Sequence, residues 1–175
     1  MNTPASHLNE IFVDACTELF QGDCHIGSIE SASGFDVTNG SVACIDGGNE
    51  QFEVILTLNL PYSALNLTLP ETGVLDIKED ELEDWNAELA NRLLGKLNHQ
   101  LELYGYYLKT GIPQSGFGIE FVHPPKDSAT LFSHCFNIDG ELIMASIQIE
   151  VYDDAAPFVR VQEEVGTNAG NIEFF

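Results

Sequence analysis

Positive charge is scarce in this chain of 175 residues. Lysine and arginine number only 6, against 28 aspartate and glutamate residues, so the formal net charge is -22 at pH 7. A nucleic-acid backbone or an anionic membrane needs a cationic surface to bind, and we therefore exclude both as partners. The acidity fits a partner with an exposed cationic group, and it fits a requirement for solubility alone equally well.

Two further absences narrow the class of protein. The chain contains no run of 18 apolar residues, so we expect no transmembrane helix. Its first residues, MNTPASHLNEIFVDAC, have no basic start and place acids within the apolar part, which is not the pattern of a secretory signal. The cysteines lack CxxC spacing, and we expect reduced thiols in a cytoplasmic protein at Cys16, Cys24, Cys44 and Cys135.

The sequence does have the composition of a folded domain. Hydrophobic residues make up 44% of the chain and the mean hydropathy is close to zero, which is typical of a globular protein with its own core. The length suits one domain. We predict a single domain over residues 1–175 that ends in an acidic tail at 154–175.

Two segments with the same order of patterns follow each other along the chain. Residues 6–21 have apolar side chains at three- and four-residue steps, which predicts a helix, and residues 26–60 then form three strand-like runs. The second half begins with a helix predicted over 79–104 and continues in three strand-like runs within 116–153. Hairpin turns are predicted at Asn39-Gly40, Asp46-Gly47-Gly48 and Asp139-Gly140.

This repetition predicts the fold. Each half, at about 6–66 and 79–153, supplies a helix and three strands, and CIDGGNEQFEVILTLNL is similar to CFNIDGELIMASIQIEV. Short hairpin turns join most neighbouring strands, so we expect antiparallel pairing. We predict an α+β fold of two layers, with long helices packed on a mainly antiparallel six-stranded sheet. A chance likeness between hairpins is the alternative to an internal duplication.

The helix predicted over 79–104 has two different sides. At 100° per residue its leucines fall on one broad stripe that would face the sheet. Asn is a poor residue for the middle of a helix, and Gly costs about 1 kcal/mol relative to Ala. Yet both occur on the opposite side, in a polar stripe of Asp84, Glu88, Asn91, Gly95, Asn98 and Glu102. A solvated face with Asn and Gly by chance is one explanation, and a docking surface for another protein is the other.

The polar stripe resembles a motif of the chemotaxis phosphatase family that contains CheX and CheC, with FliY as a relative. That motif consists of an acid or Ser, a Glu and an Asn on a long exposed helix, followed by a Pro further on. The corresponding positions here hold Asp84, Glu88, Asn91 and Pro113. The motif covers about 30 residues, and the likeness covers most of the chain if the repeated order of helix and strands is included.

The resemblance implies hydrolysis of the aspartyl phosphate on a phosphorylated CheY-like response regulator, which ends a chemotaxis signal. The partner would supply the phosphoryl group, Mg²⁺ and a lysine, so we expect no cofactor on this chain. By the same resemblance, Glu88 pairs with the partner's lysine and Asn91 orients the attacking water. An amide suits this task because it donates and accepts hydrogen bonds at once, and phosphoryl transfer depends mainly on positioning.

The remaining stripe residues are expected to contact the partner. We assign this role to Asp84, Gly95 and Asn98, with Gly95 leaving room for a second backbone. The equivalent positions of the first predicted helix hold a branched apolar residue in place of the amide, in the series Ser6, Glu10 and Val13. We therefore predict a single active site in the second half of the chain, as in CheX-like members.

Other functions stay open from the sequence. Arg92, directly after Asn91, and the acidic surface are compatible with a non-catalytic CheC-like module that binds a response regulator or acts as a scaffold. Cys24-His25 and His134-Cys135 would together satisfy zinc, but neighbouring side chains on a strand point to opposite faces, and we predict no metal site. The resemblance also allows a homodimer through exposed strand edges.

Overall fold

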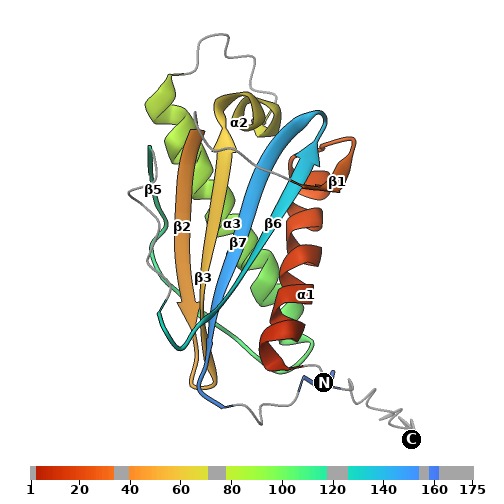
Figure 1. Cartoon of the computed structure of the whole chain (residues 1–175), viewed down its shortest axis with the longest axis vertical. Coiled ribbons are helices and arrows are strands. Elements are labelled where there is room, and N and C mark those ends of the chain that lie inside the picture. The colour runs from red at the N-terminus through yellow and green to blue at the C-terminus, as the bar shows by residue number, and fades with distance from the viewer. Residues whose placement is uncertain (1–2, 34–39, 71–77, 118–125, 154–157, 162–175) are drawn as a thin grey trace, which may run out of the picture.

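In the computed structural model, seven strands among the described residues form one sheet, and two long helices cover one of its faces (Figure 1). The structure describes residues 3–33, 40–70, 78–117, 126–153 and 158–161. In chain order the elements are α1 (Pro4–Thr17), the π-helix η1 (Glu18–Asp23), β1 (Ile29–Ala32), β2 (Gly40–Gly48), β3 (Phe52–Pro61), α2 (Tyr62–Thr68), α3 (Glu79–Glu102), β4 (Lys109–Thr110), β5 (Gln114–Phe117), β6 (Thr130–Ile138) and β7 (Glu141–Val151). Both long helices predicted from the sequence are confirmed, the first continuing as a π-helix.

The sheet has the order β1-β6-β7-β3-β2-β4, with β5 also paired to β2. Its pairs are antiparallel, as predicted. β4 pairs with Gly47 and Gly48, whereas β5 pairs with residues 41–44 of the same strand. β4 and β5 therefore act as one interrupted edge strand, so the described strands fill the six positions that the sequence pattern predicts.

The two halves of the chain are interlocked in this sheet. β1, from the first half, lies beside β6 of the second, and β5, from the second half, lies beside β2 of the first. β3 and β7 pair with each other in the middle. Two units of one helix and three strands produce this order. A shared topology does not establish an internal duplication, so the pseudo-repeat at 6–66 and 79–153 stays a prediction.

The core lies between the helices and the sheet. α1 and α3 pack on the same face of the sheet, α3 over β2 and β3, and α1 over β6 and β7 (Figure 1). Side chains alternate along a strand, and the residues of β3 that face the helices are fully buried: Phe52, Val54, Leu56, Leu58 and Leu60. Burial of each such side chain contributes roughly 1.5–3 kcal/mol. Among the described helices, none combines the length and apolar character that a membrane span requires.

One predicted turn is wrong. Residues 46–48 lie inside β2, and the β2–β3 turn follows them, closed by the side chain of Asn49, which accepts a hydrogen bond from the N–H of Gln51 at 2.9 Å. Gly47 serves packing instead of a turn, since an added Cβ would lie 3.2 Å from a methyl group of Leu94 on α3. The predicted turn at Asn39-Gly40 falls partly on residues outside the described ranges.

The predicted turn at Asp139-Gly140 is confirmed between β6 and β7, with φ of 49° and 97°. The Asp139 carboxylate also accepts hydrogen bonds from the N–H of Gly27 at 2.9 Å and the N–H and hydroxyl of Ser28 at 2.8 and 3.1 Å. The backbone donors of Gly27 and Ser28 hold the pKa of the Asp139 carboxyl below its ordinary value. This contact ties the start of β1, an edge strand, to the neighbouring turn.

Replacement of Asp139 by Asn removes the charge that these donors stabilise, so we expect the Asp139→Asn protein to melt at a lower temperature than wild type at neutral pH. Because the pKa is lowered in the folded state, the difference is fully present above the unfolded-state pKa of about 3.9 and is lost as the pH falls through the folded-state pKa. Thermal melts of both proteins from neutral pH into acid check this. A difference that stays constant with pH would contradict the role of the charge.

Candidate functional site

The two-sided character predicted for α3 is present. The leucines predicted to face the sheet are buried: Leu82, Leu89, Leu93, Leu97 and Leu101. On the opposite side Asp84, Asn91, Gly95 and Glu102 are exposed, and Glu88 is half-exposed. These five residues therefore share an accessible surface, and they are what we call the polar stripe from here on.

The acidic residues at the start of α3 are explained by interactions within the helix itself. The carboxylate of Glu81 accepts a hydrogen bond from the N–H of Lys78 at 2.9 Å, which is the Glu half of a capping box. Glu79, Asp80 and Glu81 all lie in the first turn, where negative charge complements the positive end of the helix dipole. The cap and the helix dipole account for these acids without any partner, whereas Asp84 lies beyond the first turn and belongs to the polar stripe.

Asn98 does not belong to the polar stripe, and the prediction that it is exposed is wrong. Its side chain is 7% exposed. The amide Nδ2 donates to the carbonyl oxygen of Leu108 at 3.0 Å, and Oδ1 accepts from the N–H of Leu108 at 2.8 Å. Asn98 lies at the margin of the stripe, where the chain after α3 folds back and covers it. The amide satisfies a buried backbone pair and is not available to a partner protein.

A second buried amide on α3 was missed from the sequence. Asn86 is fully buried, and its Nδ2 donates to the carbonyl oxygen of Ser41 at 3.0 Å and to the Ser41 hydroxyl at 3.1 Å. Asn86 therefore fastens the first half of α3 to β2, as Asn98 fastens the second half to Leu108. Glu88 and Asn91 lie between these two attachments.

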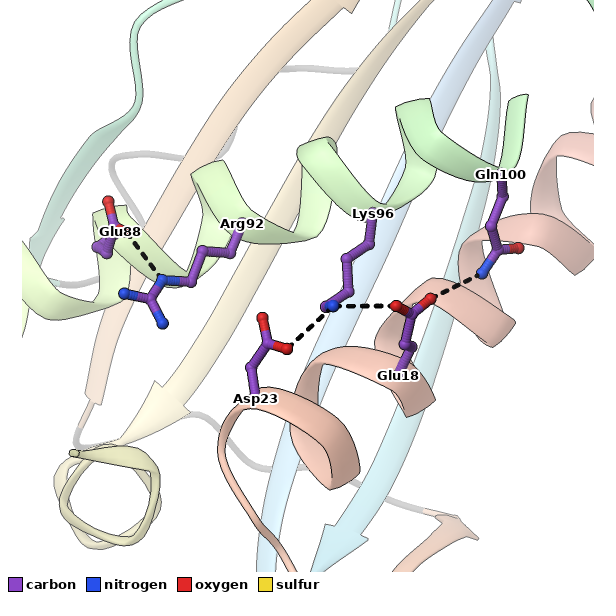
Figure 2. Close-up of polar contacts among 6 residues, drawn as sticks. All are labelled: Glu18, Asp23, Glu88, Arg92, Lys96 and Gln100. Atoms are coloured by element: carbon purple, nitrogen blue, oxygen red, sulfur yellow. Dashed lines mark hydrogen bonds and ion pairs between the residues drawn. The ribbon is translucent and has the colours of Figure 1, made fainter. Parts of the chain in front are cut away.

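Glu88 is paired within its own helix. Its Oε1 accepts a hydrogen bond from Nε of Arg92 at 2.8 Å, one turn further on (Figure 2). The Arg92 guanidinium also lies over the ring of Trp85, 5.0 Å from the ring centroid. Trp85 is held in turn by α2, since its Nε1 donates to the hydroxyl of Thr68 at 3.0 Å. A cation that approaches Glu88 therefore meets Arg92 already in place.

Lys96 joins α3 to the π-helix beside the polar stripe. Its Nζ lies 3.0 Å from Oε1 of Glu18 and 3.0 Å from Oδ1 of Asp23, and Gln100 donates to the other oxygen of Glu18 at 3.4 Å (Figure 2). Burial alone would lower the pKa of the Lys96 ammonium, but the hydrogen bonds to Asp23 and Glu18 outweigh it and raise the pKa. The sequence pattern predicted a helix here but not the π-helix that carries both carboxylates.

Asn91 and Gly95 form the open part of the polar stripe. Asn91 is exposed, and its side chain makes no hydrogen bond to any of the described residues. A Cβ added to Gly95 would meet none of their atoms within 4 Å. Contacts among the described residues thus give no reason for either an amide or a glycine at these positions.

The other predicted features of the motif occupy different places. Pro113 lies between β4 and β5, at the interruption of the edge strand. On α1, Glu10 is exposed, while Val13 is partly buried against the core, so no amide stands where Asn91 stands on α3.

The alternative zinc site, made of Cys24, His25, His134 and Cys135, is not formed among the described residues. Across the parts of the chain that the structure describes, no three His, Cys, Asp or Glu side chains are grouped so as to hold a metal ion. His134 instead shares a hydrogen bond of 2.7 Å with Oδ1 of Asn9 on α1. The four cysteines are free.

Chemotaxis proteins are among the solved structures with this architecture. CheX from Vibrio vulnificus is 14% identical over 82% of this chain and 99% of that chain, with a TM-score of 0.66. A CheC-like superfamily protein from Shewanella sp. PV-4 is 15% identical over 82% and 97%, with a TM-score of 0.65. A chain from the CheX–CheY–BeF3–Mg²⁺ complex of Borrelia burgdorferi is 16% identical over 82% and 97%, with a TM-score of 0.64.

These likenesses show that the chain has a CheC-like fold, as the sequence resemblance predicts. The sequence matches no family model and no curated protein. At 14–16% identity, similarity of structure establishes the fold and leaves the activity to be argued from the residues of α3.

Asn98→Ala and Asn91→Ala remove the same amide from a buried and an exposed position of one helix, and we expect very different effects on stability. Asn98→Ala leaves the N–H and the carbonyl of Leu108 without their partner and should cost about 2 kcal/mol or more. Asn91→Ala should change the free energy of unfolding by no more than about 0.5 kcal/mol, because the side chain is exposed and Ala is the better helix former. Urea denaturation measures both, and equal effects would contradict the assignment of one amide to the core and the other to the surface.

Proposed function

We propose that this protein is a CheX-like phosphatase that hydrolyses the aspartyl phosphate of a CheY-like response regulator, using Glu88 and Asn91 on α3. The observation that carries the proposal is the polar stripe. Asp84, Glu88 and Asn91 occur at the spacing of the family motif, and they are accessible together with Gly95 on the outer side of a helix in a CheC-like fold. One of the structures with this fold is described as a CheX–CheY complex.

Asn91 would position the attacking water. Its amide is exposed and has both a donor and an acceptor that no described residue uses, so one water can be held by two hydrogen bonds and directed in line with the bond that breaks. Phosphoryl transfer through a loose transition state depends on positioning and on neutralised charge more than on a strong base. We assign Mg²⁺, which neutralises phosphoryl charge, to the response regulator, so this chain contributes geometry and needs no cofactor of its own.

Glu88, Asp84 and Gly95 would dock the regulator. A carboxylate on the polar stripe offers an ion pair to a lysine of the partner, and the net charge of -22 favours such a cationic group. A side chain at Gly95 would meet no atom of the described residues within 4 Å, so this position allows a second backbone to come close to α3. A cytoplasmic location and a homodimer through a strand edge remain part of the same proposal.

One observation favours the alternative of a non-catalytic module that binds a response regulator. Glu88 is already paired to Arg92, so the docking carboxylate is occupied in the free protein. A scaffold of this kind would bind the regulator and leave the lifetime of its phosphate unchanged. Binding and dephosphorylation therefore have to be measured on the same pair of proteins.

The catalytic role of Asn91 is tested by the decay of a phosphorylated response regulator from the source organism, followed with and without this protein. We expect wild type to accelerate the decay and Asn91→Ala to lose about 100-fold or more of that acceleration, as is typical when one positioned hydrogen-bonding group is removed. Asn91→Ala should still bind the regulator, which a titration checks. Equal decay rates with wild type and Asn91→Ala would refute the catalytic role, and binding without any acceleration would favour the scaffold.

The role of Gly95 is tested by increasing its side chain. Gly95→Ala should stabilise the free protein by up to about 1 kcal/mol, because Ala is the better helix former and the added Cβ meets no atom. Affinity for the regulator should fall for Gly95→Ala and further for Gly95→Leu, since each side chain enters the space of the partner. Thermal melts and binding titrations separate the two effects, and undiminished affinity of Gly95→Leu would place the interface elsewhere.

A further inference from the structure

The two cations of α3 are held in different ways. Lys96 lies between two carboxylates of η1, and its side chain is 18% exposed. Arg92 pairs with one carboxylate of the described residues, Glu88, and its side chain is 41% exposed. Figure 2 shows Arg92 extending along α3 to Glu88, whereas Lys96 extends across to η1. Lys96 therefore has a structural role between two elements, while the Arg92–Glu88 pair is accessible and can open without separating them.

The Arg92–Glu88 pair is ordered but weak enough to exchange. We call the arrangement with Arg92 on Glu88 the closed form. An exposed ion pair one helical turn apart and a cation–π contact together favour it by roughly 3- to 30-fold. Trp85 is fixed by its hydrogen bond to Thr68, so the aromatic surface under the guanidinium does not have to form anew each time. A competing cation must overcome this preference to reach Oε1 of Glu88.

We propose that Arg92 is an internal competitor for the docking carboxylate: it occupies Glu88 in the free protein and is displaced when a cationic group of the partner binds there. This inference rests on the proposed function, in which Glu88 receives that group. A chain with a net charge of -22 attracts cationic surfaces of many kinds. With Arg92 on Glu88, a cation gains little at this point unless its protein also makes contacts with the open part of the stripe, at Asn91 and Gly95.

The flank of α3 offers the displaced guanidinium another carboxylate. Asp23 of η1, 35% exposed, lies on the same side of α3 as Arg92 and is shared with Lys96 (Figure 2). The positive charge of Arg92 already acts on the neighbouring Cys24: burial raises the pKa of this thiol to about 11, and Arg92 and Lys96 partly oppose that rise. Arg92 thus lies near the end of η1 in the closed form. After its release from Glu88, the guanidinium is still close to the carboxylate of Asp23.

The test compares the affinity of wild type, Arg92→Gln and Lys109→Gln for one probe, the CheY-like regulator held in its active form by beryllofluoride and Mg²⁺. We expect Arg92→Gln to bind about 3- to 30-fold more tightly than wild type, because no internal cation has to leave Glu88. Lys109→Gln removes the same charge from an exposed position on β4, outside the polar stripe, and should stay within about twofold of wild type. The gain should disappear in the double variant Glu88→Gln/Arg92→Gln.

The outcomes distinguish this inference from the proposed function. Equal affinity of Arg92→Gln and Lys109→Gln overturns the competition, and weaker binding by Arg92→Gln also overturns it, since Arg92 would then contact the regulator itself. If instead Glu88→Gln binds like wild type and Asn91→Ala accelerates phosphate loss like wild type, the proposed function fails as well. Each substitution is at an accessible side chain, so we expect all variants to melt close to the wild-type temperature. Thermal melts check this and exclude unfolding as the cause of a change in affinity.

Discussion

The hydrogen bonds of two buried asparagines determine which side α3 presents to solvent. A stripe of leucines fits the sheet over a range of helix rotations, but an amide bond is directional, and a buried group without its partner costs about 1–3 kcal/mol. Asn86 is bonded to Ser41 on β2, and Asn98 is bonded to both backbone groups of Leu108. The two are 12 residues, or about 18 Å, apart along the helix. The outward direction of the polar stripe follows from these attachments.

The sequence predicted what depends on periodicity. The spacing of the leucines predicted which side of α3 is buried, and the alternation along strands such as β3 predicted a sheet that is covered by helices on one face. It did not predict contacts that depend on segments distant in the chain. Asn98 is a polar residue type that usually lies on the surface, and it is buried here because the chain after α3 returns over it. Gly47 is a residue type that is common in turns, yet it lies in strand β2, where Leu94 leaves no room for a side chain.

The pairing of Glu88 shows a different kind of limit. A motif specifies which residue types occur at which spacing, and it is silent about the residues between them. Arg92 stands four positions after Glu88, in the order that favours a helical ion pair, so the sequence did contain the information for this contact. The contact changes the meaning of the motif, because an acid with an internal partner presents less charge to an approaching protein than a free acid does.

The interlocked strand order has a consequence for how the molecule folds. β1 finds its partner in β6, more than 100 residues later in the chain, and β5 finds its partner in β2. Either half alone would retain one long hairpin, β2–β3 or β6–β7, and isolated hairpins are marginal in water. The sheet therefore gains its stability only when both halves are present, which favours all-or-none unfolding and, with so many contacts between distant segments, slow folding.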